Sequence, residues 1–464
     1  MSDAHVLDPT ILREYDIRGV VDEDFSAIDV AAIGWAFATI VKEGGGSRVA
    51  VGYDGRLSSP GLEQSMVAGL SLAGVDVLRV GLGPSPMLYY AGATEEVDAA
   101  VMITGSHNPP EYNGIKMSIG GNSFYGDDIQ RLGKICASGD FVQGNEPGNI
   151  ESTKVFTAYV ERILSDYRGT KNLKVAWDPA NGAAGEAVSE LVKKLPGQHF
   201  LINEKIDGNF PAHHPDPTVE KNLEQLKALV AENECDLGFG FDGDGDRIGV
   251  IDGKGRVLWG DQIMVLLARE VLADEPGATI IADVKASQAF FDAITEMGGN
   301  PIMWKTGHSL IKTKMVETGA PLAGEMSAHI FFKHRYYGFD DALYAAVRLL
   351  SIVASSDKSL ADMRDELPQM INTPEIRFDC PEERKFAVVD EVKSRLQGRE
   401  GISVNDIDGV RVLSDDGWWL LRASNTQAVL VARCESESEE GLARLKSTLS
   451  EELEKSGVSV PDLG

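Results

Sequence analysis

The stretch Arg48-Val-Ala-Val-Gly-Tyr-Asp54 predicts a short buried β-strand that ends in a carboxylate. The same pattern returns as Lys174-Val-Ala-Trp-Asp178 and as Ala278-Thr-Ile-Ile-Ala-Asp283. In each copy the strand is followed by a loop with Gly or Ser and then by a helical pattern, which is typical of an α/β unit. The copies stand roughly 105 to 125 residues apart, so they predict three related α/β domains.

The part of the chain after residue 367 lacks this opening pattern. It alternates strand-like runs, such as Val429-Leu-Val431, with a polar helix from about Ser438 to Lys455. Two segments that contain Gly or Pro, Gln143–Gly148 and Leu367-Pro368, are typical of linkers. We therefore predict an α/β protein with three related mixed α/β domains and a smaller C-terminal α+β domain. The predicted domains cover residues 1–150, 151–254, 255–367 and 368–464.

The composition is that of an ordinary soluble globular protein, with 464 residues, 43% apolar residues and 25% charged residues. The segment Met1–Asp8 has no basic region followed by an apolar run, and no stretch of 18 uncharged apolar residues occurs, so we expect neither secretion nor a membrane span. Cys136, Cys235, Cys380 and Cys434 are widely spaced. We expect them to be reduced structural thiols in a cytoplasmic protein.

A candidate nucleophile follows the apolar run Ala99–Ile103. The segment Thr104-Gly-Ser-His-Asn-Pro109 places Ser106 on a tight loop directly after this predicted strand. The preceding Gly gives backbone freedom, and the following His, Asn and Pro favour a sharp exposed turn. A serine in such a loop is suited to carry a phosphoryl group or to lie beside a bound anion.

A candidate metal site follows the strand-like run Asp236–Phe241. The segment Asp242-Gly-Asp244-Gly-Asp246-Arg247 places three carboxylates at alternating positions, so that in an extended loop all three lie on one side. Three such ligands bind a hard cation and leave coordination positions for a phosphate oxygen, as is usual for Mg²⁺ in phosphoryl transfer. The adjacent Arg247 also suits a phosphate.

A calcium-binding EF-hand is the alternative interpretation of this acidic segment. An EF-hand loop requires Gly at position six and Glu at position twelve. Counted from Asp242, those positions hold Arg247 and Gly253, so the EF-hand interpretation fails.

Two further loops carry polar groups that suit a phosphosugar. Glu325 and Ser327 alternate in Gly324-Glu-Met-Ser-Ala-His329 and could bind two neighbouring hydroxyls from one side. Arg422-Ala-Ser-Asn-Thr426 combines a guanidinium fork with hydroxyl, amide and backbone N–H donors, a set suited to an anionic phosphate.

In this order and at these separations, the four loops resemble the α-D-phosphohexomutase superfamily, specifically its bacterial phosphomannomutase/phosphoglucomutase group. The resemblance spans nearly the whole chain and also includes Tyr15-Asp-Ile-Arg18-Gly19, Val51–Arg56, Lys305–Lys312 and Tyr337–Asp341. It implies the predicted domains, arranged around one cleft with one signature loop from each.

The resemblance also implies a role for each candidate residue. Ser106 would be the phosphoserine, and the metal site would comprise Ser106, Asp242, Asp244 and Asp246, with Mg²⁺ as the ion. The catalytic residues would be Ser106, His107, Arg18, Lys116 and Arg247. The substrate-binding residues would be Tyr15, Lys285, His308, Glu325, Ser327, His329, Arg422, Ser424, Asn425 and Thr426.

The implied reaction moves a phosphate between O1 and O6 of a hexose, with glucose and mannose as the sugars. Ser106 donates its phosphate to hexose 1-phosphate or 6-phosphate and takes back the other phosphate from a 1,6-bisphosphate that has turned end over end. Glucose 1,6-bisphosphate is therefore expected as an intermediate and activator. Mg²⁺ would neutralise charge on the moving group, and Arg247 and Lys116 would stabilise its oxygens.

Three residues are candidates for the general acid or base. His107 is a candidate by position, although it could instead orient the loop. Arg18 and Lys116 are equal candidates if neighbouring cations depress their pKa values.

Two other enzymes and one non-enzyme compete with this interpretation. A metal-dependent sugar phosphatase would share the acidic segment, but it has no need for a separate Arg422 clamp. A phosphosugar or cation sensor would not need Ser106 together with three aspartates. Phosphoglucosamine mutase is disfavoured by Met326 and Asn425.

The chain departs from the family pattern at Ala328, where Gly is usual, and at Gln427-Ala428, where an acidic residue or Thr followed by Pro is common.

The net charge of −28 makes nucleic acid and anionic membranes unsuitable partners. We expect a monomer that binds small phosphosugars. Because these ligands are anions, cations should concentrate beside the named loops. The candidates are Arg18, Lys116, Arg247, Lys285, His308 and Arg422.

Overall fold

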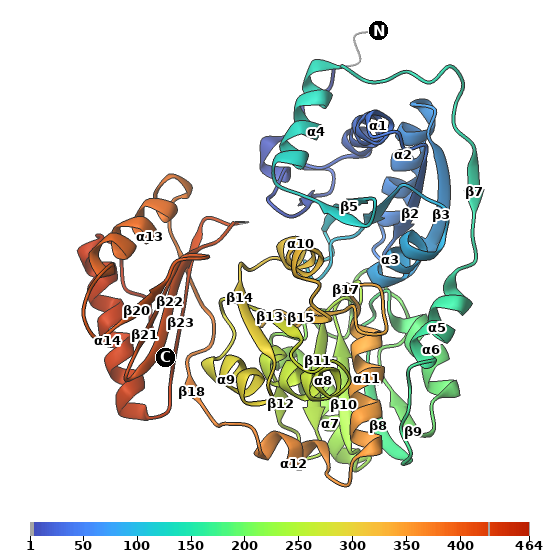
Figure 1. The fold of residues 1–464 in the computed structure, drawn as a ribbon. Helices are drawn as coiled ribbons and strands as arrows, with labels where there is room; N and C mark the ends of the chain where they lie inside the picture. Colours follow the sequence, from blue (N-terminus) through green and yellow to red (C-terminus); the bar gives the residue numbers. More distant parts are fainter. Residues whose placement is uncertain (1–3, 426, 464) are drawn as a thin grey trace.

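The computed structural model describes residues 4–425 and 427–463 and contains four β-sheets, each with its own helices (Figure 1). The first domain lies at the upper right of Figure 1, the second and third lie together below it, and the fourth lies at the left. The predicted fold class, three related mixed α/β domains and a smaller α+β domain, is confirmed. Among the described residues, no helix combines the length and apolar character needed to cross a membrane.

The first sheet has seven strands in the order β1-β5-β4-β2-β3-β7, with β6 added beside β5. Its strands are β1 (Ile17–Val20), β2 (Arg48–Tyr53), β3 (Asp76–Leu82), β4 (Ala99–Ile103), β5 (Tyr112–Ile119), β6 (Asn122–Phe124) and β7 (Ile150–Ser152). Its helices are η1 (Pro9–Ile11), α1 (Ala27–Glu43), α2 (Ser59–Leu72), α3 (Ser85–Thr94) and α4 (Asp127–Ser138). All five residues of β4 are buried, because helices cover both faces of this apolar strand.

The second and third sheets have five strands each. The second domain contains α5 (Phe156–Leu164), β8 (Leu173–Asp178), α6 (Gly185–Lys194), β9 (Gly197–Leu201), η2 (Glu220–Leu223), α7 (Glu224–Glu232), β10 (Leu237–Phe241), β11 (Ile248–Asp252) and β12 (Val257–Leu258). The third contains α8 (Gly260–Asp274), β13 (Thr279–Asp283), α9 (Gln288–Glu296), β14 (Asn300–Trp304), α10 (His308–Thr318), β15 (Leu322–Gly324), β16 (Ile330–Phe332), β17 (Phe339–Asp340), α11 (Ala342–Ser355) and α12 (Leu360–Asp365).

The first three sheets share one spatial order of strands, although β1 precedes the other strands of its sheet in the chain, whereas β12 and β17 follow the other strands of theirs. The orders β3-β2-β4-β5-β1, β9-β8-β10-β11-β12 and β14-β13-β15-β16-β17 correspond strand by strand. In each, the second strand is parallel to both neighbours and the last two pairings are antiparallel. The loops with Ser106, with the three aspartates and with Glu325 are therefore the same hairpin connection in three domains.

The carboxylate that ends the repeated strand holds this hairpin in two of the domains. Asp54 accepts hydrogen bonds from Thr104 Oγ1 at 2.8 Å and from the Gly105 N–H at 3.2 Å. Asp283 accepts one from the Met326 N–H at 3.1 Å. Asp178 instead accepts from the Ala180 N–H at 2.9 Å and from Asn203 Nδ2 at 3.0 Å. Both donors lie outside the β10–β11 hairpin.

The fourth sheet has the order β18-β23-β22-β21-β20, with β19 added beside β23. Its elements are β18 (Ile371–Asn372), β19 (Ile376–Asp379), α13 (Glu382–Leu396), β20 (Ser403–Asn405), β21 (Val410–Ser414), β22 (Gly417–Ala423), β23 (Val429–Ser436) and α14 (Glu439–Lys455). Ser438 caps α14 by accepting from the Gly441 N–H. Both helices pack on this sheet, which explains why the sequence pattern differs from the α/β repeat.

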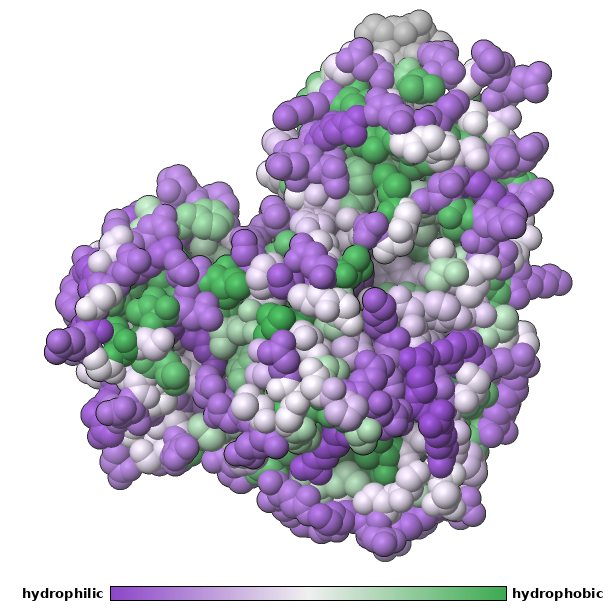
Figure 2. All heavy atoms as spheres, viewed as in Figure 1, coloured by the Kyte–Doolittle hydropathy of each residue, from purple (hydrophilic) through white to green (hydrophobic). Residues whose placement is uncertain are grey.

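The cores of the domains are connected unequally. One apolar core joins the second and third domains and extends to α3 and one face of the first sheet. The fourth domain has its own core, and its apolar contact with the third domain is a small cluster of Val284, Trp418 and Leu420. Figure 2 shows a recess between the fourth domain at the left and the first domain at the upper right. All four cysteines are buried and form no disulfide, as their spacing predicted.

The departure at Ala328 has a physical cost. This residue lies in the β15–β16 loop with φ of +68°, in the left-handed region that disfavours a side chain. Its conformation is needed, because its carbonyl accepts a hydrogen bond from the Ile248 N–H at 3.1 Å and thereby joins the loop to the second domain.

We expect Ala328→Gly to stabilise the protein by about 0.5–1 kcal/mol, because the left-handed penalty of about 1–2 kcal/mol exceeds the added chain entropy of Gly. Calorimetry of the unfolding transition of the core shared by the second and third domains measures this gain. Ala323→Gly is the matched control: Ala323 is buried within β15, so the same replacement should destabilise. Destabilisation by both variants would contradict the strain at position 328.

Candidate active site

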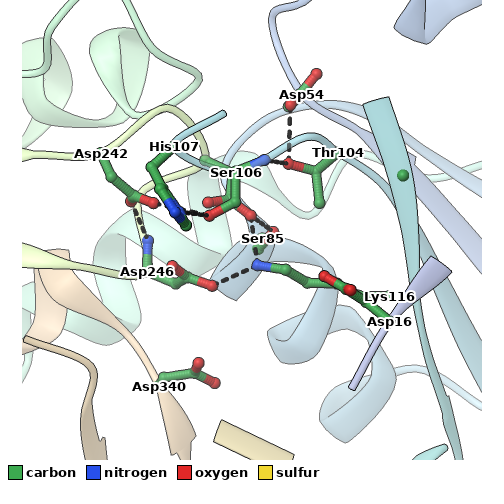
Figure 3. Close-up of polar contacts among 12 residues, drawn as sticks. Asp16, Asp54, Ser85, Thr104, Ser106, His107, Lys116, Asp242, Asp246 and Asp340 are labelled. Atoms are coloured by element: carbon green, nitrogen blue, oxygen red, sulfur yellow. Dashed lines mark hydrogen bonds and ion pairs between the residues drawn. The ribbon is translucent and has the colours of Figure 1, made fainter. Parts of the chain in front are cut away.

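Ser106 lies where the first and second domains meet. The β4–β5 hairpin carries it, its φ is +49°, and its side chain is buried. Its Oγ donates to Asp242 Oδ2 at 3.1 Å and lies 3.2 Å from His107 Nδ1 (Figure 3). The backbone N–H of Ser106 donates to Thr104 Oγ1 at 2.8 Å. The candidate nucleophile and the first candidate metal ligand are therefore in direct contact.

The guanidinium of Arg56 binds the backbone of the Ser106 loop. This guanidinium is fully buried and bonds to the carboxylate of Asp54 at 3.2 Å. It donates to the backbone carbonyls of residues 106, 108, 109 and 112, at 2.7, 2.6, 2.5 and 3.0 Å. Sequence reasoning included Arg56 only in the family resemblance and missed this role. The available signal was an arginine two residues after the strand-ending aspartate, but its acceptors are some fifty residues away.

The three aspartates of the β10–β11 hairpin converge. One ligand oxygen from each of Asp242, Asp244 and Asp246 lies within 4.8 Å of the others, and all three side chains are fully buried. Burial, followed by the charges of Asp244 and Asp246, raises the pKa of Asp242 well above its usual value. Asp244 Oδ1 is buried without a hydrogen-bond partner among the described residues. An unpaired oxygen in a cluster of three carboxylates fits a hard divalent cation.

Lys116 compensates part of this negative charge. Its Nζ lies 2.7 Å from Asp244 Oδ2 and 2.6 Å from Asp246 Oδ2. Although burial opposes the charged form, these two carboxylates raise the pKa of Lys116 well above its usual value. A proton-carrier role was expected only if neighbouring cations depressed the pKa of Lys116, and in this arrangement that condition is not met.

His107 and His329 have opposite electrostatic surroundings. Burial, followed by the charges of Arg247 and Arg18, lowers the pKa of His107 well below its usual value. His329 is also buried, which lowers its pKa, but Asp246 at 3.1 Å and Glu325 at 2.9 Å more than offset this and raise the pKa of His329 to about 9. His107 is therefore neutral beside Ser106, and His329 is an imidazolium between two carboxylates.

The metal-loop and sugar-loop hairpins form one backbone-bonded unit. Arg247 and His329 pair as an isolated antiparallel bridge. The Arg247 N–H also donates to Asp242 Oδ1 at 3.1 Å, and its guanidinium lies 3.9 Å from Asp216. Because the loops are bonded to each other, the positions of the metal ligands and of Glu325 are coupled.

The remaining candidates surround this unit. Arg18 Nη1 donates to Asn108 Oδ1 at 2.6 Å, and Lys285 Nζ donates to Glu375 at 3.0 Å. The Tyr15 hydroxyl donates to the Thr306 carbonyl at 2.8 Å and accepts from Asn425 Nδ2 at 2.6 Å.

His308 of the third domain and the Arg422 loop of the fourth domain lie in the same region. The His308 ring lies 6.3 Å from the Tyr15 ring and 5.7 Å from the His329 ring. Asn425 of the fourth-domain loop contacts the Tyr15 hydroxyl. Arg422 and Ser424 are buried, and Ser327 lies half-buried in the turn of the sugar loop. Thr426 lies outside the described residues. A cavity of about 170 Å³ between the first and third domains has Tyr15, Lys116 and His308 in its lining.

Four family models match successive parts of the chain. They are the phosphoglucomutase/phosphomannomutase alpha/beta/alpha domains I, II and III, at residues 9–143, 156–255 and 259–371, and the C-terminal domain, at residues 375–452. Together they match most of each of the four sheets, with β7 and β12 in the short gaps between the matched ranges.

Curated relatives and solved structures agree. A Pseudomonas aeruginosa phosphomannomutase/phosphoglucomutase is 42% identical over 458 residues, which cover 99% of this chain and 98% of that protein. A Neisseria gonorrhoeae phosphoglucomutase is 41% identical over 94% of this chain and 95% of its own length. A Burkholderia thailandensis phosphoglucomutase/phosphomannomutase family protein of known structure is 42% identical, with a TM-score of 0.93 over 98% of this chain and 99% of its own. The chain belongs to the phosphoglucomutase/phosphomannomutase family.

Proposed function

We propose that the protein is a phosphohexomutase that interconverts hexose 1-phosphate and hexose 6-phosphate, with glucose and mannose as its sugars. The observation that carries this proposal is the contact of 3.1 Å between Ser106 Oγ and Asp242, inside a cluster of three buried carboxylates. A nucleophilic oxygen beside a cation site is the arrangement that phosphoryl transfer needs. The names of the full-length relatives support the same reaction.

In the proposed reaction the phosphate starts on Ser106. A sugar hydroxyl oxygen forms a new bond to phosphorus, the bond from phosphorus to Ser106 Oγ breaks, and the proton lost by the sugar hydroxyl is balanced by the proton that Ser106 Oγ gains. The hexose 1,6-bisphosphate turns over, and Ser106 Oγ takes the other phosphate by the reverse step. Neutral His107, 3.2 Å from Ser106 Oγ, is placed to hold the proton at that oxygen. Glucose 1,6-bisphosphate would restore enzyme that has lost its phosphate.

The acidic cluster would hold Mg²⁺ through Asp242, Asp244 and Asp246, with an oxygen on Ser106 as a further ligand. When bound, the ion would neutralise charge on the transferred phosphoryl group. The cationic side chains of Lys116 and Arg247 would stabilise its remaining oxygens. They are buried or half-buried beside the cluster, where electrostatic interactions are stronger than in water.

The other loops would hold the rest of the substrate. Glu325 and Ser327 would bind the O3 and O4 hydroxyls, which are the same in glucose and mannose. The phosphate that does not react would bind Arg422, Ser424, Asn425 and Thr426. Tyr15, Lys285, His308, His329 and Arg18 would complete the substrate contacts, and we propose a monomer as the working unit.

We expect Ser106→Ala to remove nearly all mutase turnover while hexose phosphate binding stays within a few-fold, because only the phosphoryl carrier is lost. A coupled assay with glucose 1-phosphate and added 1,6-bisphosphate, with calorimetry for binding, measures both. Intact-mass analysis should find one added phosphate on wild type and on the control Ser65→Ala, a serine of α2, but none on Ser106→Ala. Turnover within tenfold of wild type would exclude Ser106 as the nucleophile, and release of inorganic phosphate would indicate a phosphatase.

Asp244→Ala should abolish Mg²⁺-dependent activity and weaken Mg²⁺ binding measured by calorimetry without substrate. The reason is that one of only three protein carboxylates is removed from a hard cation. Wild type stripped of metal should regain activity when Mg²⁺ is returned. Normal turnover by metal-free wild type in chelator would show that the carboxylate cluster is structural.

Arg56→Lys should reduce kcat at least tenfold and change KM for glucose 1-phosphate less than threefold. A lysine ammonium is a point charge and cannot replace a planar guanidinium that binds four carbonyls of the Ser106 loop. Arg48→Lys is the matched control, since Arg48 begins β2 and forms a partly exposed pair with Glu151. Equal kcat values for the two variants would exclude a role of Arg56 in placing the nucleophile.

A further inference from the structure

Asp408 connects the phosphate-binding loop of the fourth domain to the third domain. It lies between β20 and β21, and its side chain is 12% exposed. Its Oδ2 accepts from Arg422 Nε at 3.1 Å and its Oδ1 accepts from Arg422 Nη2 at 3.3 Å. The same Oδ2 accepts from the Thr306 backbone N–H of the third domain at 3.0 Å. One carboxylate therefore orients the guanidinium and bonds to a neighbouring domain.

Thr306 lies at a junction of three domains, in the connection between β14 and α10. Its N–H donates to Asp408 of the fourth domain, and its carbonyl accepts from the Tyr15 hydroxyl of the first domain at 2.8 Å. Its hydroxyl donates to Asp283 of the third domain at 3.3 Å. Each polar group of this residue is thus bonded to a different domain.

The junction continues directly into the sugar loop. The Gly307 N–H, next to Thr306, donates to Glu325 Oε1 at 2.7 Å. Asp283, which accepts from Thr306, also accepts from the Met326 N–H at 3.1 Å. Two short paths of hydrogen bonds therefore lead from Arg422, through Asp408 and Thr306, to the loop that carries Glu325.

We propose that Asp408 is a positioning residue that couples the placement of Arg422 to that of Glu325. The inference rests on the proposed function, in which Arg422 binds the distal phosphate and Glu325 binds a sugar hydroxyl. The fourth domain meets the third through a small apolar cluster, so its position is not imposed by a large shared core. When the fourth domain is in place, Asp408 supplies the acceptor for the Thr306 N–H, and the segment next to Glu325 is held.

The consequence is that sugar selectivity depends on a residue that contacts no sugar hydroxyl. We expect wild type to prefer glucose 1-phosphate over galactose 1-phosphate, because galactose inverts the hydroxyl at C4. Without the carboxylate of Asp408, Glu325 is held less firmly. The enzyme then discriminates less between the two configurations of the C4 hydroxyl. The ratio of kcat/KM for the two sugars measures this and does not depend on the fraction of folded enzyme.

The experiment compares Asp408→Ala with the matched control Asp406→Ala, because an asparagine at position 408 would keep an oxygen that can accept from the Thr306 N–H. Asp406 lies two residues away, is half exposed, and pairs with Lys393 inside the fourth domain at 2.5 Å. We expect the glucose-to-galactose ratio to fall at least fivefold in Asp408→Ala and to stay within twofold in Asp406→Ala. A ratio within twofold of wild type in Asp408→Ala overturns the proposal. Circular dichroism checks folding, and Asp408→Leu, which is close to Asp in shape, replaces the Ala variant if the latter fails to fold.

A second measurement does not depend on activity. Amide hydrogen exchange of a peptide covering residues 304–308, in enzyme without ligand, reports the Thr306 and Gly307 N–H bonds directly. We expect exchange at least fivefold faster in Asp408→Ala and unchanged in Asp406→Ala, and equal exchange in both overturns the coupling. If wild type lacked mutase turnover, the proposed function would fail, and this measurement would still decide whether Asp408 holds the segment.

Discussion

The carboxylates of Asp242, Asp244 and Asp246 repel one another, and burial adds to the free energy of keeping them charged. The polar contacts around them reduce this cost from several directions: Lys116 binds two of them, and the imidazolium of His329 binds one. These compensating groups come from the first and third domains, so the buried charge of the second domain is stabilised by its contacts with both neighbours. The same contacts place the nucleophile and the sugar loop beside the cluster.

Sequence patterns were sufficient for the parts of this site that are local in the chain. The strand that ends at Asp54 and its two copies predicted the three α/β domains, because strand periodicity and a following turn involve only neighbouring residues. Alternating aspartates likewise predicted a cation cluster. What the sequence could not show is the partner of each side chain across the domains. Arg56 binds carbonyls some fifty residues away, and Asp408 meets an N–H about a hundred residues away.

The three similar domains have equivalent strands, but equivalent residues in them form different hydrogen bonds. Asp54 and Asp283 hold the hairpin beside their strand, whereas Asp178 bonds to its own loop and to His213. The metal loop needs no such support, because Asp242 accepts the N–H groups of residues 246 and 247 itself. A repeated residue in the sequence therefore identifies an equivalent position in the fold. The neighbouring groups determine which hydrogen bonds that residue forms.

The separate core of the fourth domain also affects the thermodynamics of unfolding. Its apolar residues pack among themselves, while one large core joins the second and third domains and extends to one face of the first sheet, beside separate clusters within each of these domains. Cooperativity follows shared burial, so heat or urea should melt the fourth domain as a unit of its own and the other domains more nearly together. A single melting temperature is then not a complete description of this molecule. Ligands that bridge the fourth domain to the others would bring the separate transitions closer together.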